Sequence, residues 1–124
     1  MIVGPGDAEP SQSPGGEVAA SLVPAQQVTF DRRELDRLFG LYGRKVAAGE
    51  WRDYAIDFGR EKAVFSVFRH ASEIPLYRIE KNPRLARRQG AYSVIAATGL
   101  ILKRGHELTR VLAVLEKSLH LAAV

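Results

Sequence analysis

Four basic residues lie within eight positions that contain no acid: Lys81, Arg84, Arg87 and Arg88. Arginine side chains neutralise phosphates and stack on bases, and loops carry binding residues more often than strands do. Tyr77 and Tyr92 flank the segment and offer aromatic rings for stacking. The pattern favours a binding site for RNA or another polyanion. The alternative is that the four residues are solvated charges, or belong to a short helix after Pro83 and pair with acids of the core.

A second basic group occupies the predicted first helix: Arg32, Arg33, Arg37, Arg44 and Lys45. Most of these residues alternate with acidic ones, which indicates ordinary pairing on the helix surface. Arg44 and Lys45 have fewer acids nearby. We therefore expect these two to join the binding site only if they share a face with the loop around Arg84.

The sequence assigns no catalytic residues, no metal site and no cofactor. It contains no cysteine, which excludes disulfides, thiolate metal sites and cysteine nucleophiles. His106 and Glu107 begin like a zinc-protease helix, but position 110 is Arg instead of the second His of that motif. The glycines show neither Walker nor Rossmann spacing.

Paired carboxylates also give little support to an enzyme. Asp53 and Asp57 point the same way on a predicted strand, but four residues along a strand span roughly 13 Å. This exceeds the separation of about 5–9.5 Å between the paired acids of glycosidases. An active site would need Asp53, Asp57, His70 or Tyr77 in mutual contact, and an enzyme is the third interpretation.

Charge and composition divide the chain at about residue 28. Residues 1–28 carry three acids and no base, so residues 29–124 hold all 18 Lys and Arg against the other 11 acids, a net charge of +7. Four of the six prolines also lie in residues 1–28, together with several glycines. We expect a disordered tail over 1–28 and a single domain over 29–124. No apolar run approaches the roughly 18 residues of a membrane helix, and the N-terminal residues lack the basic start of a secretory signal. A soluble, cytoplasmic protein with no membrane partner is therefore expected.

The elements that must position these residues follow from periodicity. Asp31 as N-cap and Glu34 three residues later predict a helix start, and Gly49 predicts its end. Its buried stripe is predicted to comprise Leu35, Leu38, Phe39, Tyr42 and Val46. Gly40 and Gly43 inside this helix suggest that another backbone packs closely against it.

The rest of the chain predicts about five strands and a last helix. Alternating or β-branched runs separated by turn residues cover 53–58, 63–68, 76–80, 92–96 and 100–104. A C-terminal helix follows, with a buried stripe from Leu108 to Leu119. Short connections favour an α+β fold in which an antiparallel meander carries both helices on one face.

Long runs of this sequence resemble a known family. LYGRKVAAGEWRDYAIDF (41–58), FSVFRHASEIPLYRIEKNPRLARRQGAYSV (65–94) and LILKRG (100–105) are similar to short alphaproteobacterial proteins catalogued as a domain of unknown function. The resemblance covers most of residues 29–115. It implies a bacterial, cytosolic origin and carries over no activity and no catalytic residue.

These observations rank three hypotheses. The first is a non-catalytic binding or regulatory module whose basic surface takes RNA or another polyanion. The second is a protein–protein interaction or homodimerisation module that uses the open face or an edge of the sheet. The third is an uncharacterised enzyme.

Overall fold

A computed structural model describes residues 26–70 and 74–123 of the chain, with residues 117–123 described in their backbone only. The predicted disordered tail covers residues 1–28, and its residues 1–25 lie outside this range. At its end, the Val28 amide donates a 2.7 Å hydrogen bond to the Gly59 carbonyl. Within these described residues, two long helices, five strands and one 3-10 turn follow each other in this order: α2 (Arg32–Ala47), β1 (Asp53–Phe58), β2 (Ala63–Phe68), β3 (Tyr77–Lys81), η1 (Pro83–Leu85), β4 (Tyr92–Ala96), β5 (Ile101–Gly105) and α3 (Leu108–Ala123).

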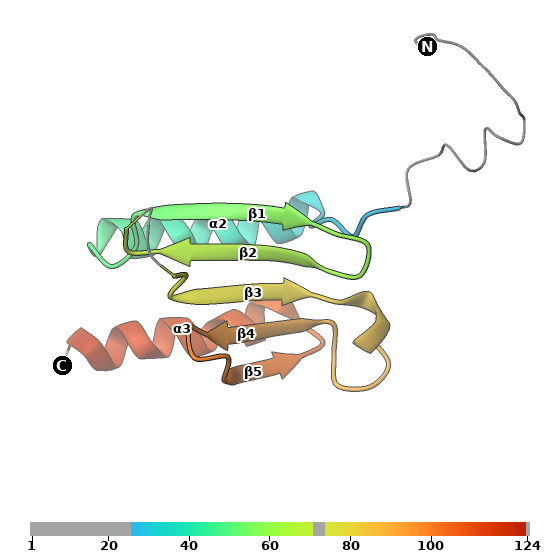
Figure 1. The fold of residues 1–124 in the computed structure, drawn as a ribbon. Coiled ribbons are helices and arrows are strands. Elements are labelled where there is room, and N and C mark those ends of the chain that lie inside the picture. The colour runs from blue at the N-terminus through green and yellow to red at the C-terminus, as the bar shows by residue number, and fades with distance from the viewer. Residues whose placement is uncertain (1–25, 71–73, 124) are drawn as a thin grey trace, which may run out of the picture.

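The five strands form one antiparallel sheet in the order β1-β2-β3-β4-β5, so each strand pairs with its neighbour in sequence. Both helices lie behind the sheet in Figure 1, and α2 and α3 also touch each other. Side chains from both helices join those of the strands in a single core. The predicted α+β meander with its two helices on one face is therefore confirmed.

Helix α2 begins and ends as its local sequence predicts. The Asp31 carboxylate accepts a 2.8 Å hydrogen bond from the Glu34 amide, and the Glu34 carboxylate accepts one of the same length from the Asp31 amide. This is a complete capping box. Gly49 follows the helix with a φ of +78°, a conformation that glycine adopts without a side-chain clash.

The predicted buried stripe of α2 is wrong in part. The buried side chains are Leu38, Leu41 and Lys45, with Glu34 at the helix start, and the predicted Leu35 and Tyr42 pack partly buried against the core. Phe39 is 37% exposed and Val46 is 42% exposed. The stripe is rotated because two charged residues, which sequence reasoning assigns to the surface, occupy its ends and have partners inside the protein.

The glycine prediction for α2 is also wrong. A Cβ on Gly43 would meet nothing within 4 Å, and one on Gly40 would meet only the Arg44 side chain at 3.7 Å. No backbone of the described residues packs closely against the helix at these positions.

Strand boundaries agree with the sequence patterns to within one residue, and the one-residue difference at β3 matters for the site. This strand runs over Tyr77–Lys81, so Lys81 belongs to the sheet and not to the loop. Tyr77, Ile79 and Lys81 share one face, and Ile79 is fully buried in the core. Lys81 therefore points toward the helices.

Candidate functional site

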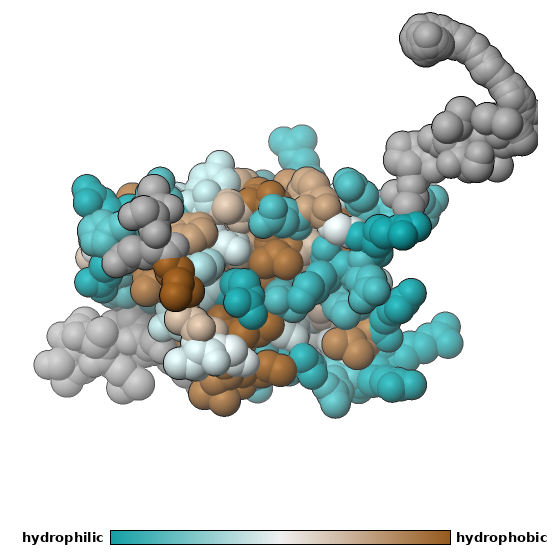
Figure 2. Space-filling view, in the orientation of Figure 1, coloured by the Kyte–Doolittle hydropathy of each residue, from teal (hydrophilic) through white to brown (hydrophobic). Residues whose placement is uncertain are grey.

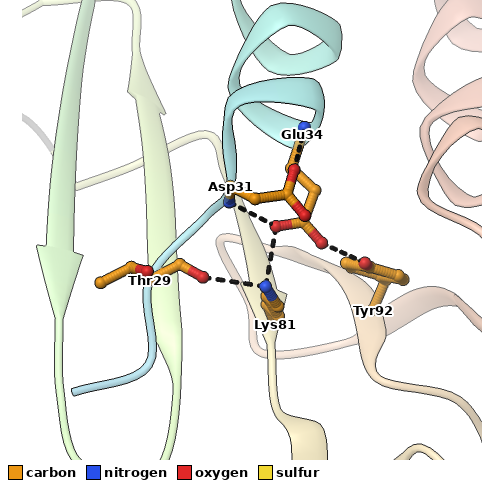
Figure 3. A network of polar contacts seen from close by, with 5 residues as sticks. All are labelled: Thr29, Asp31, Glu34, Lys81 and Tyr92. Atoms are coloured by element: carbon orange, nitrogen blue, oxygen red, sulfur yellow. Dashed lines mark hydrogen bonds and ion pairs between the residues drawn. The ribbon is translucent and has the colours of Figure 1, made fainter. Parts of the chain in front are cut away.

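A partly buried polar network joins the first turn of α2 to the two strands β3 and β4 of the sheet (Figure 3). Glu34 is only 8% exposed. Its Oε1 accepts hydrogen bonds of 2.8 Å from both the Asp31 amide and the Lys81 ammonium, and its Oε2 accepts one from the Tyr92 hydroxyl. Lys81 Nζ also donates to the carbonyl of Thr29 at 2.9 Å. The network links segments that are 47 and 58 residues apart in sequence.

Sheet register brings the network together. Lys81 on β3 and Tyr92 on β4 are directly opposite each other in the ladder. Side chains of directly opposed residues lie on the same face about 5 Å apart, which lets both reach one carboxylate. Lys81, predicted as part of the binding loop, is thus held in an ion pair and its side chain is 19% exposed.

The Tyr92 hydroxyl is a hydrogen-bond donor to Glu34 in this arrangement. Burial raises the pKa of its phenol most, and the hydrogen bond and negative charge of Glu34 raise it further. The phenol therefore stays protonated near neutral pH and keeps its bond to Glu34.

A pocket of about 500 Å³ adjoins the network between the starts of α2 and α3. It is lined by Asp31, Arg33, Glu34, Arg37, Tyr92, His106, Glu107, Leu108 and Thr109. Glu107 pairs with Arg110 at 3.2 Å. Within residues 26–70 and 74–116, neither Arg33 nor Arg37 makes an ion pair.

The loop that follows β3 carries the three arginines of the predicted binding segment, and all three are exposed: Arg84, Arg87 and Arg88. The Asn82 side chain caps η1 by accepting from the Arg84 amide at 3.1 Å. Gly90 fixes the far end of the loop against β5. A Cβ at position 90 would overlap the carbonyl of Gly105 and lie 2.6 Å from the backbone nitrogen of His106.

Arg44 and Lys45 both have partners in the structure, contrary to their apparent lack of compensation in the sequence. Arg44 pairs with Glu116 of α3 at 2.7 Å, and both of these side chains are exposed. Lys45 is 2% exposed and donates to the carbonyl of Leu115 at 2.8 Å. Both lie in the last turn of α2, whereas the loop around Arg84 lies near the helix start, at the other end of the sheet (Figure 1).

The acids and histidines weighed for catalysis stay apart. Asp53 and Asp57 lie on β1 opposite Phe68 and Val64, and neither lines the pocket beside Tyr92. His70 lines a second pocket of about 550 Å³ with Arg52 and Arg69, next to residues 71–73, which lie outside the described residues. Among the residues that the structure describes, no three His, Asp or Glu side chains are grouped to hold a metal ion.

Sequence reasoning missed the residues that the structure brings together at the pocket. The sequence predicts that Glu34 completes the capping box and is one of the acids that pair with the arginines on the surface of this helix, Arg33 and Arg37 among them. Glu34 instead pairs with Lys81, which leaves both arginines beside the pocket. The one available signal in the sequence was the spacing of Arg33 and Arg37, four residues apart on one helix face.

No helix of the described segments has both the length and the apolar character needed to cross a membrane. Comparison with curated proteins and with solved structures finds no match. A family model described as "Protein of unknown function (DUF2794)" matches residues 28–112, which is more than half of the chain and includes α2, the whole sheet and the start of α3. The chain therefore belongs to the DUF2794 family of proteins of unknown function.

Proposed function

We propose that this protein is a non-catalytic binding or regulatory module of the bacterial cytoplasm, with a basic surface for RNA or another polyanion. The observation that carries the proposal is the exposure of Arg84, Arg87 and Arg88 on one anchored loop. Because Asn82 and Gly90 fix both ends of the loop, the arginines lose little additional freedom on binding.

We restrict the proposed binding residues to arginines that are not bonded to other parts of the protein. Lys81 and Lys45 are bonded inside the protein, and Arg44 is paired with Glu116. The proposal therefore rests on the three loop arginines. Arg104 on β5 donates hydrogen bonds to the side chains of Ser93 on β4 and of Gln89, which lies next to the loop arginine Arg88.

The chain topology supports the same surface. In a meander, the β1–β2 turn and the β3–β4 loop lie at one end of the sheet, and Figure 1 shows that both helices also begin there. Arg60 of that turn is exposed. Hydrophilic residues dominate this end of the face seen in Figure 2. Helix starts carry partial positive charge, which adds to the attraction for phosphates.

Contacts to bases are not part of this proposal. Tyr92 is bonded to Glu34, and the Tyr77 ring packs 6.3 Å from the ring of the buried Trp51. Neither ring offers a free stacking platform. Binding is therefore expected to depend on phosphates and to show little sequence preference.

Fluorescence anisotropy with a labelled single-stranded RNA tests the proposal. Three phosphate contacts predict a slope of roughly −2 for log K against log salt. The variant R84E/R87E/R88E should weaken binding at low salt by more than about tenfold. R52E/R69E/K103E is the matched control, because it changes the net charge equally at other exposed positions. Absence of binding at low salt, or an equal loss in both variants, would contradict the proposal.

A protein–protein or homodimer module is the second candidate. Three large apolar residues are strongly exposed near the β4–β5 edge or the start of β3: Ile74 at 74%, Leu100 at 63% and Ile101 at 44%. Apolar residues gather on the β4–β5 side of the face seen in Figure 2. Sedimentation of the wild type and of L100K/I101K is the test. A wild-type dimer that becomes a monomer in L100K/I101K would support this candidate. A wild type that is monomeric at every concentration would contradict homodimerisation.

A further inference from the structure

Two arginines of α2 stand beside the pocket without an ion-pair partner among the described residues. Arg33 and Arg37 are four residues apart, so they lie on the same side of the helix with Cβ atoms about 6 Å apart. Two guanidinium groups at this spacing can contact one anionic group from two sides. A doubly charged group satisfies both, which favours a phosphate monoester over a single carboxylate.

The acids that line the pocket are occupied by other partners. Asp31 accepts from the Glu34 amide at 2.8 Å, and Glu34 itself is shared by Lys81 and Tyr92. Glu107 pairs with Arg110 at 3.2 Å. Glu34 and Glu107 thus pair with cations other than Arg33 and Arg37, and the Asp31 carboxylate is bonded to a backbone amide. Among the described residues, the two arginines therefore remain available to a ligand.

The size and the walls of the pocket point to a ligand larger than a free phosphate ion. A volume of about 500 Å³ lies in the range of roughly 300–1,000 Å³ that is usual for small-molecule sites. Tyr92 and Leu108 supply apolar wall, and His106 and Thr109 supply polar groups around it. The Glu34 network holds Tyr92 in place, so this wall is formed before any ligand arrives.

We propose that the pocket between the starts of α2 and α3 binds a small organic phosphomonoester, with Arg33 and Arg37 on the phosphate and the organic part against Tyr92 and Leu108. This site is separate from the loop arginines Arg84, Arg87 and Arg88. Neither site needs the other, and the two can be tested separately.

Two-dimensional amide NMR of the full chain, titrated with ribose 5-phosphate, inorganic phosphate and ribose, tests this site. Ribose 5-phosphate should produce saturable shifts at Arg33, Arg37 and His106 to Thr109. Inorganic phosphate should bind there more weakly, and ribose should produce no shifts. The variant R33A/R37A should lower the affinity for ribose 5-phosphate by at least about tenfold. R32A is the matched control, because Arg32 is on the same helix but does not line the pocket, and its affinity should equal that of the wild type.

Several results would overturn the proposal. They are the absence of saturable shifts, shifts confined to the second pocket at Arg52, Arg69 and His70, equal shifts with ribose, and unchanged affinity in R33A/R37A. The spectrum of each variant also reports whether it is folded. R84E/R87E/R88E should keep ribose 5-phosphate binding, so loss of RNA binding and loss of this site are distinguishable.

Discussion

The ammonium group of Lys45 on α2 donates a 2.8 Å hydrogen bond to the backbone carbonyl of Leu115 on α3, at a position where Lys45 is 2% exposed. Glu50 lies 3.5 Å from the same nitrogen, and the Trp51 ring centroid lies 5.6 Å from it. The buried charge thus has a carbonyl, a carboxylate and an aromatic face around it. It links the two helices through a hydrogen bond at a buried position.

The substitution Lys45→Ala should lower the free energy of unfolding by about 2–3 kcal/mol, because it removes a charged hydrogen bond and leaves the Leu115 carbonyl without its donor. Urea denaturation measures the change. Arg44→Ala is the control: its pair with Glu116 is exposed and should contribute less than about 1 kcal/mol. Equal losses in the two variants would show that Lys45 has no special role.

The substitution Glu34→Gln should destabilise the protein by about 2 kcal/mol. Glu34 accepts from three donors, and an amide group has only one acceptor oxygen and loses the charge that faces Lys81. Urea denaturation is again the measurement. Asp36→Asn, on the exposed side of the same helix, should change stability by no more than about 0.5 kcal/mol. If Glu34→Gln left the free energy of unfolding unchanged, the network would not depend on the charge of Glu34.

Because of Tyr92, we expect the free energy of unfolding to fall in alkaline solution. Its pKa is raised in the folded protein by burial and by Glu34, so its contribution is fully present below the unfolded value of about 10 and falls as the pH rises above it. The difference in unfolding free energy between the wild type and Tyr92→Phe should therefore shrink from about pH 9 to about pH 11. The pKa of Tyr42 is also raised, chiefly by burial, but both proteins share that contribution. A constant difference would contradict the prediction.

Two glycines with positive φ should differ sharply in their tolerance of alanine. Gly90 has a φ of +104° and no room for a Cβ beside Gly105, whereas Gly99 has a φ of +93° and nothing within 4 Å. Gly99→Ala should lower the free energy of unfolding by only about 1–2 kcal/mol, the cost of holding an alanine at positive φ. Gly90→Ala should cost more than about 3 kcal/mol, because the loop must move off β5. Thermal unfolding of the two variants compares them directly, and a similar Tm for both would refute the close packing at Gly90.

Local signals accounted for most of the secondary structure. The Asp31 and Glu34 capping box, the positive φ of Gly49 and the four-residue turn between β1 and β2 each depend on residues within one turn of the chain. The sequence also identified the strands, because their side-chain alternation is a local pattern. The family resemblance agreed with the matched region, residues 28–112.

The buried face of α2 was harder to predict. Hydrophobicity assigned Phe39 and Val46 to the core, but the structure buries Lys45 and Glu34 at the ends of the stripe. A charged residue can occupy a core position only when other groups there form hydrogen bonds or an ion pair with it. Those partners, Leu115 and Lys81, come from distant parts of the chain.

The sequence alone determined the order of elements and the meander. Only the tertiary structure decided which charges are paired: Lys81 and Lys45 are bonded in or near the core, and Arg44 pairs with Glu116 on the surface. Arg33 and Arg37 line the pocket. Caps, turns and alternation depend on neighbours a few residues away. Ion pairs such as Glu34–Lys81, 47 residues apart, depend on sheet register and helix placement, which no local pattern encodes.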